Sequence, residues 1–141
     1  MKPVLVLISL LLLGSCATFA PQIDSRLVGN WVYADEVQSC RYSFNADGSF
    51  KGEVRIGGRA VSRFTGRWTV KENALSYTYL GDALGHIPPG ATDRDRLLEI
   101  TNKYFLIQAM NGEKRRYQRL RYEGELKSLP YSENPKIKLP N

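Results

Sequence analysis

Hydrophobic and polar residues alternate in short runs between residues 27 and 121, and turn-forming residues separate these runs. In residues 49–56, for example, Phe50, Val54 and Ile56 fall on one face while charged residues fall on the other. This period of two is typical of half-buried β-strands, and a repeat of about ten residues is typical of all-β sandwiches and barrels. The eight predicted strands are residues 27–33, 39–45, 49–56, 60–70, 74–80, 95–101, 103–110 and 113–121.

The turn near residues 57–59 determines the register of the third and fourth predicted strands. A three-residue loop at 57–59 places Glu53 opposite Arg63, which is a favourable cross-strand pair. A two-residue loop would instead set Lys51 opposite Phe64 and mix the polar and apolar faces. We therefore predict the three-residue loop.

Eight consecutive strands joined mostly by short turns predict an up-and-down antiparallel meander. Asn111-Gly112 is the strongest of the hairpin signals. Closing the meander removes exposed strand edges, so we predict an all-β fold, an eight-stranded up-and-down antiparallel barrel. The interior of such a barrel either packs solid or holds one small ligand. The long connection at residues 81–93 is a candidate lid.

Three segments resemble recurrent pieces of small bacterial lipocalin-like proteins, namely Leu27-Val28-Gly29-Asn30-Trp31, residues 42–50 and residues 66–70. The resemblance extends over residues 27–121 and implies a lipocalin-like barrel with Gly29, Trp31 and Trp68 as structural anchors. It also implies that Arg119 or Arg121 packs over the Trp31 ring and closes the base of the barrel by a cation–π contact.

A short apolar segment at residues 4–13 precedes the barrel region. It is too short to span a bilayer, and it follows Lys2 as the apolar part of a secretory signal would. Directly after it, Leu13-Gly14-Ser15-Cys16 resembles the lipobox of bacterial lipoproteins, which implies lipidation of Cys16. An ordinary signal peptide with cleavage among the small residues at 17–20 is the alternative.

The lipobox resemblance divides the chain into a signal peptide at 1–15, a lipidated tether at 16–26, the barrel domain at 27–122 and a proline-containing tail at 123–141. Ala17, rather than aspartate, after the cysteine implies an outer-membrane protein that faces the periplasm, with the membrane as its partner. A tether of this length reaches roughly 35 Å when extended, so the domain stays near the membrane.

The formal net charge of +6 is a mild basic excess, which favours anionic surfaces. No basic run interleaves with aromatic residues, so we expect no nucleic-acid partner. With Cys16 acylated, Cys40 has no partner in the chain. Cys40 shares strand parity with Tyr42 and Phe44, which predicts a buried, reduced thiol, with an intermolecular or reactive cysteine as the alternative.

Adjacent strand residues face opposite ways, so either Arg115 or Arg116 points into the barrel unless both lie at a solvated hairpin tip. A buried arginine needs a carboxylate or an anionic ligand, because an unpaired buried charge is costly. We therefore expect an arginine of this hairpin to hold the head group of an anionic amphiphile. The candidate ligand-binding residues are Arg115, Arg116 and Arg119 for the head group and Phe64, Leu98 and Leu106 for the tail.

Catalytic and metal-binding patterns are missing from the sequence. The single histidine, His86, lies in a Gly/Pro-rich loop, and there is no Gly-x-Ser-x-Gly motif and no metal-ligand spacing. Asp93 and Asp95 could share a strand face, but the interleaved Arg94 and Arg96 favour a salt-bridged surface. We expect no enzyme, no metal and no cofactor.

The sequence thus favours a protein that acts by binding. The occupant would be a small apolar or amphipathic molecule in the barrel, or an envelope component on its surface. A protease-inhibitor-like or scaffolding module that acts through protein contacts is the alternative.

Overall fold

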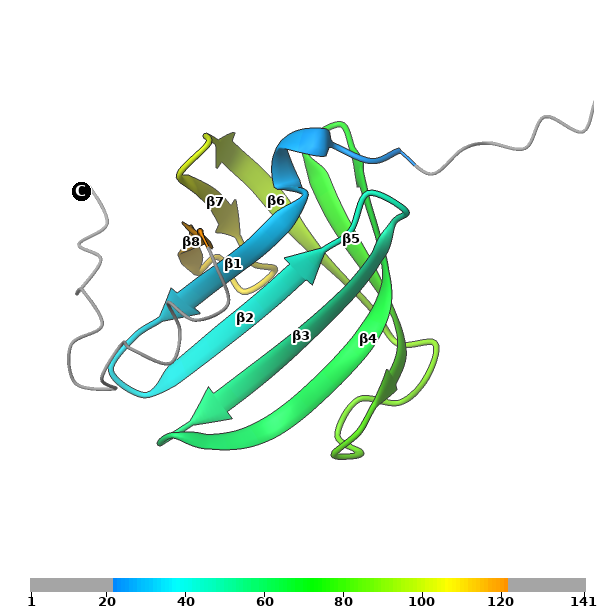
Figure 1. Cartoon of the computed structure of the whole chain (residues 1–141), viewed down its shortest axis with the longest axis vertical. Helices are drawn as coiled ribbons and strands as arrows, with labels where there is room; N and C mark the ends of the chain where they lie inside the picture. Colours follow the sequence, from blue (N-terminus) through cyan, green and yellow to red (C-terminus); the bar gives the residue numbers. More distant parts are fainter. Residues whose placement is uncertain (1–21, 122–141) are drawn as a thin grey trace, which may run out of the picture.

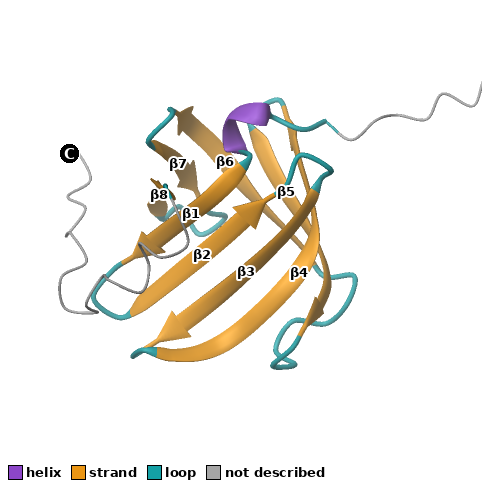
Figure 2. Cartoon of the chain, viewed as in Figure 1, coloured by secondary structure: helices purple, strands orange, loops and turns teal. Residues whose placement is uncertain are grey.

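The computed structural model describes residues 22–121, which form a closed barrel of eight antiparallel strands in sequential order (Figure 1). Apart from a short 3-10 turn, η1, these residues are strands and loops (Figure 2). The elements are η1 (Ser25–Leu27), β1 (Gly29–Ala34), β2 (Gln38–Phe44), β3 (Ser49–Ile56), β4 (Arg59–Lys71), β5 (Ala74–Asp82), β6 (Thr92–Ile100), β7 (Tyr104–Gln108) and β8 (Lys114–Leu120). The predicted fold class and strand number are confirmed.

The meander sends alternate connections to opposite ends of the barrel. The β1–β2, β3–β4, β5–β6 and β7–β8 connections lie at one end, which we call the open end. The other three connections and η1 lie at the opposite end, which we call the closed end. The closed end is therefore the one that the chain enters from residue 22.

Large aromatic side chains fill the closed half of the interior. Trp31, Phe44, Trp68 and Phe105 are each at most 1% exposed. The Trp31 and Phe105 rings meet edge to face at 4.8 Å, and such pairs contribute about 0.5–1.5 kcal/mol beyond burial. The Trp31 indole N–H donates to the Leu27 carbonyl at 2.7 Å, so this buried polar group is satisfied.

Arg119, rather than Arg121, closes the base of the barrel. Its guanidinium lies 4.1 Å from the centroid of the Trp31 ring and donates to the carbonyls of Val28 at 2.8 Å and Arg26 at 2.6 Å. Gly29 has φ +134°, and a Cβ there would lie 2.5 Å from the Arg119 guanidinium. The glycine two residues before the tryptophan is therefore required by its backbone conformation, and its missing side chain also lets the arginine cross close to the backbone.

The β3–β4 hairpin corrects one sequence prediction. Its turn contains two residues, Gly57 and Gly58, and not three. Glu53 nevertheless pairs with Arg63, as predicted, with an ion pair of 2.7 Å. The two-residue turn still leads to this pairing because the register shifts by one residue next to Val61. A β-bulge there adds the one residue that a three-residue turn would have added.

The described part of the chain begins to pack before residue 27. The Val70 N–H donates to the Gln22 carbonyl at 2.8 Å, and Ile23 packs against the core. Residues 22–26, which we assigned to the tether, therefore contact the barrel. The predicted signal peptide, Cys16 and the tail at 123–141 lie outside the described residues. In the range 22–121 no helix is long and apolar enough to cross a membrane.

Candidate functional site

The open half of the barrel contains a cavity of about 390 Å³. This volume lies within the range of roughly 300–1,000 Å³ that is common for small-molecule sites. Its aromatic walls are formed by Tyr33, Tyr42, Phe64, Tyr79 and Tyr117. Its polar lining includes Cys40, Ser62, His86, Asp93 and Arg115.

The cavity exists because the inner face carries smaller side chains toward the open end. Cys40, Val54 and Ser62 line it, whereas the same face carries tryptophan and phenylalanine in the closed half. Gly52 also lies on the inner face, where a Cβ would meet the Phe64 ring at 2.2 Å. The Tyr42 ring stacks on Tyr77 at 5.5 Å, so the floor of the cavity is a packed aromatic layer.

Arg115 points into the cavity, and Arg116 lies on the outer face over the Tyr104 ring at 4.4 Å. The Arg115 guanidinium is 5.8 Å from the Tyr33 ring centroid and forms a 2.8 Å ion pair with Glu113. This hydrogen bond to Glu113 raises the pKa of Arg115, despite the opposing effect of burial. The charge of the inward arginine is therefore compensated by a carboxylate of its own hairpin.

Two carboxylates share the inner face of β6. Asp93 lines the cavity, and Asp95 lies two residues further along the strand and is 8% exposed. The expected surface salt bridges with Arg94 and Arg96 are wrong, since the ion pairs of residues 22–121 include neither aspartate. The parity signal was present in the sequence, because both aspartates are in step with the buried Leu97.

Asp95 lies in an unusual environment for a carboxyl group. Burial, reinforced by the negative charge of Asp93, raises the pKa of Asp95 to about 6, although Tyr77 and Arg115 act in the opposite direction. The Tyr77 hydroxyl approaches the carboxyl without reaching hydrogen-bond geometry, and it is buried with no partner among the described residues. The Tyr77 hydroxyl is thus a buried polar group whose hydrogen-bonding capacity is not used.

Cys40 is a buried free thiol, as its parity with Tyr42 and Phe44 predicted. Burial raises the pKa of the Cys40 thiol to about 11, and hydrogen bonds from Tyr117 and Tyr42 only partly oppose this effect. The thiol is therefore protonated at neutral pH, which is the opposite of an activated nucleophile.

The β5–β6 connection, residues 83–91, is shorter than the predicted 81–93 and is held in place by Asp82. The Asp82 carboxylate accepts hydrogen bonds from the backbone N–H groups of Leu84 at 3.0 Å and His86 at 3.1 Å. It also accepts from the Ser62 hydroxyl at 2.8 Å and from the N–H of Ile87 at 3.2 Å. Burial raises the pKa of Asp82, but these hydrogen bonds outweigh it and hold the pKa well below its usual range.

The structure brings only part of the predicted ligand set together. Phe64 and Arg115 line the cavity. Leu98 is 38% exposed and Leu106 pairs with Arg116 on the outer face, so neither leucine lines the cavity. Arg119 lies at the opposite, closed end.

Several lining residues were not predicted from the sequence. They are Tyr42, Tyr79, Tyr117 and Asp93, and each follows the same period-two alternation as its buried strand neighbours.

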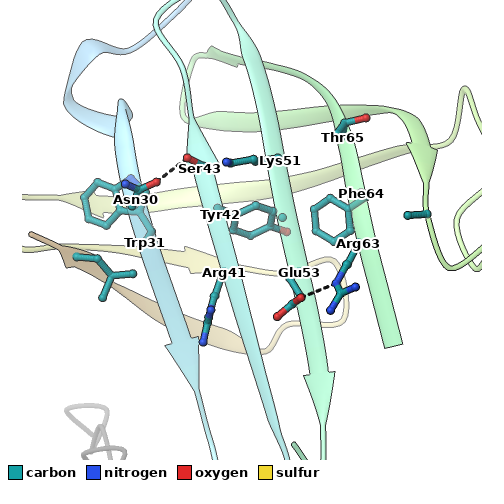
Figure 3. Close-up of a pocket in the computed structure, with 13 residues that line it drawn as sticks. Asn30, Trp31, Arg41, Tyr42, Ser43, Lys51, Glu53, Arg63, Phe64 and Thr65 are labelled. Atoms are coloured by element: carbon teal, nitrogen blue, oxygen red, sulfur yellow. Dashed lines mark hydrogen bonds and ion pairs between the residues drawn. The ribbon is translucent and has the colours of Figure 1, made fainter. Parts of the chain in front are cut away.

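A second hollow, of about 560 Å³, lies on the outer face of β1–β4 (Figure 3). Its backbone floor includes Gly52, and its rim carries the outward polar side chains of these strands. Many of these already bond one another, with Ser43 donating to Asn30 at 2.5 Å and Arg63 donating to Glu53 at 2.7 Å. Trp31, Tyr42 and Phe64 also line this hollow, but the inner cavity has five aromatic side chains around it inside the barrel and is the stronger candidate site.

Metal binding has no support within residues 22–121, where no group of three or more His, Cys, Asp or Glu residues could hold an ion.

Comparison with known proteins connects this chain to others only through its fold. No protein-family model and no curated protein matches it. A lipocalin-like protein from Bacteroides uniformis superposes with a TM-score of 0.50 at 18% identity, over 67% of this chain and 99% of that one. A second protein from the same organism, solved by NMR, gives a TM-score of 0.50 at 16% identity, over 73% of this chain and 97% of the other. The chain therefore has a closed eight-stranded barrel fold that is similar to that of a lipocalin-like protein.

Proposed function

We propose that this protein is a lipoprotein of the bacterial cell envelope, anchored through Cys16, whose barrel binds a small amphipathic molecule without transforming it. The observation that carries the proposal is the division of the interior into a filled half and a hollow half. The aromatic walls suit an apolar body, and the polar groups Asp93, His86 and Arg115 suit a head group.

Non-enzymatic binding agrees with the chemistry of the cavity. The one thiol that lines it, Cys40, has a raised pKa, which disfavours nucleophilic attack. The inward Arg115 is already paired with Glu113, so it is not poised to stabilise a developing negative charge.

The position of the chain entry supports the proposed anchor. The described residues begin at the closed end, and Gln22 lies six positions after Cys16 in the sequence, a reach of roughly 20 Å. An anchor at Cys16 would place the closed end near the membrane and leave the mouth of the cavity uncovered. We place the anchor in the outer membrane, on its periplasmic face.

One observation favours a second candidate, an inhibitor-like or scaffolding module. Such a module needs a rigid exposed loop, and the connection 83–91 is exposed at Leu84 yet held by hydrogen bonds to Asp82. In this case the partner would be an envelope protein.

Mass spectrometry of the mature protein isolated from the envelope of its own host tests both parts of the proposal. We expect an intact mass that lacks residues 1–15 and carries acyl chains on Cys16, with a non-covalent small molecule in the native spectrum. An unmodified chain would contradict the anchor. A spectrum with no small molecule, in which a protein partner is retained instead, would favour the second candidate.

A further inference from the structure

The charges around the cavity do not balance. Arg115 is the one lysine or arginine among the described residues that line it, and Glu113 neutralises Arg115 through a 2.8 Å ion pair. Asp93 lines the cavity, opposite Tyr77 in the strand register, and forms no ion pair with any described residue. Asp95 is not a lining residue; it lies two residues deeper on β6, opposite Leu75, and it also forms no ion pair within residues 22–121. With Arg115 neutralised, Asp93 is the uncompensated charge among the described residues that line the cavity, and the negative charge of the deeper Asp95 also acts on the lining residue Tyr79.

Unused hydrogen-bonding capacity lies beside these carboxylates. The Tyr77 side chain is 1% exposed, and its hydroxyl has no hydrogen-bond partner within residues 22–121. This hydroxyl lies in the interior near Asp95, on the neighbouring strand. A buried hydroxyl without a partner costs free energy, so the layer beneath the cavity retains an unused hydrogen-bonding group, although Tyr77 is not itself a lining residue.

The remaining walls suit a positive charge. The rings of Tyr33, Tyr42, Tyr79 and Tyr117 line the cavity. The face of an aromatic ring attracts a cation through its quadrupole, and the attraction increases when water is excluded. Carboxylates combined with aromatic faces are complementary to an organic cation and not to an anion.

We propose that the bound molecule carries an amine or another cationic nitrogen, which Asp93 holds while the tyrosine rings surround the adjoining apolar part and the deeper Asp95 adds its negative charge from below. This inference rests on the proposed binding function and specifies its ligand class. It replaces the anionic head group expected from the sequence, because Glu113 already occupies the inward arginine.

Three probes with the same tail and different heads provide the test: octylamine, octanol and octanoate. Each is titrated by calorimetry at about pH 7.5 into the full chain carrying Cys16→Ser, which removes the proposed acylation site and leaves residues 22–121 unchanged. We expect octylamine to bind at least about tenfold more tightly than octanoate, with octanol between them, as a charge-assisted contact implies.

Removing the carboxylates one at a time assigns the preference to them. Asp93→Asn should reduce the ratio of octylamine to octanoate affinity several-fold, and Asp95→Asn should reduce it less, because Asp95 does not line the cavity. Glu72→Gln removes one negative charge at the closed-end β4–β5 turn and should leave the ratio unchanged. Because Asp93 is exposed, Asp93→Asn should leave the core packing unchanged.

The outcomes separate the two claims. If octanoate binds as tightly as octylamine, or if Glu72→Gln changes the ratio as much as Asp93→Asn does, the cationic ligand is excluded while the binding function stands. If none of the three probes binds, the proposed function fails and the inference fails with it.

Discussion

Asp95 combines burial with a negative neighbour, and both effects oppose its ionisation. Its pKa is raised from 3.8 to about 6 in the folded protein, chiefly by burial. The ionised carboxyl is therefore worse solvated in the folded state than in the unfolded state, so its contribution to stability declines as pH rises from about 4 through about 6.

We predict that Asp95→Asn stabilises the protein in a pH-dependent manner. The gain in the free energy of unfolding should be near zero at about pH 4 and should reach about 1–2 kcal/mol above pH 7. This is less than the roughly 1.4 kcal/mol that each pKa unit would give, because solvent screening lowers the cost of the ionised form. Urea unfolding of variant and parent at both pH values measures it. A gain that is the same at both pH values would contradict the raised pKa.

Individual residues differ in how far the sequence predicts their roles. Period-two parity was enough to predict that one of Arg115 and Arg116 faces inward, and that Cys40 is buried. It did not choose between Arg119 and Arg121, because that choice depends on which side chain reaches Trp31 across the closed barrel. Asp95 was misassigned because the neighbouring arginines suggested salt bridges that the strand geometry does not allow.

At the scale of elements, one side chain determines the conformation of the β5–β6 connection. Asp82 accepts from the backbone of Leu84, His86 and Ile87 within residues 83–91, and also from Ser62 and the N–H of Arg63 on β4. Because the pKa of Asp82 is lowered, the carboxylate stays ionised and keeps these hydrogen bonds even when the pH falls below the ordinary carboxyl pKa. The hydrogen bonds are lost only as the pH falls through the lowered pKa.

We predict that Asp82→Asn loosens this connection and leaves the barrel intact. An amide presents N–H groups to donors that need an acceptor, so hydrogen exchange at Leu84, His86 and Ile87 should accelerate about tenfold or more. Exchange measured by NMR at about pH 6 tests this. Asp47→Asn is the matched control, because Asp47 accepts from Ser49 in the closed-end β2–β3 turn. Unchanged protection within residues 83–91 of the Asp82 variant would show that other contacts hold the connection.

The strands themselves could be predicted, because alternation and turn residues are local signals. The β3–β4 bulge could not, since a two-residue turn with a bulge and a three-residue turn both place Glu53 opposite Arg63. Local sequence thus predicted the pairing but not the backbone path that achieves it.

For the whole molecule, the central feature is a barrel filled at one end and hollow at the other. Closure could be argued from strand number, but the cavity depends on the sum of inward side-chain volumes after the register is known. Small inward residues, such as Val54 and Ser62, gather in one half only when the strands are correctly staggered. The sequence therefore left the choice between a solid and a hollow barrel open.

Binding of octanol to a matched pair of variants tests the central claim most directly. Val54 lines the cavity, whereas Val32 lies on β1 on the outer face, opposite Arg41 and Gln118. In the full chain carrying Cys16→Ser, Val54→Trp should fill the cavity and weaken octanol binding about tenfold or more. Val32→Trp should leave the affinity unchanged, with both variants showing cooperative thermal unfolding. Equal octanol affinity in the two variants would contradict the account, because it would place the binding site outside the barrel.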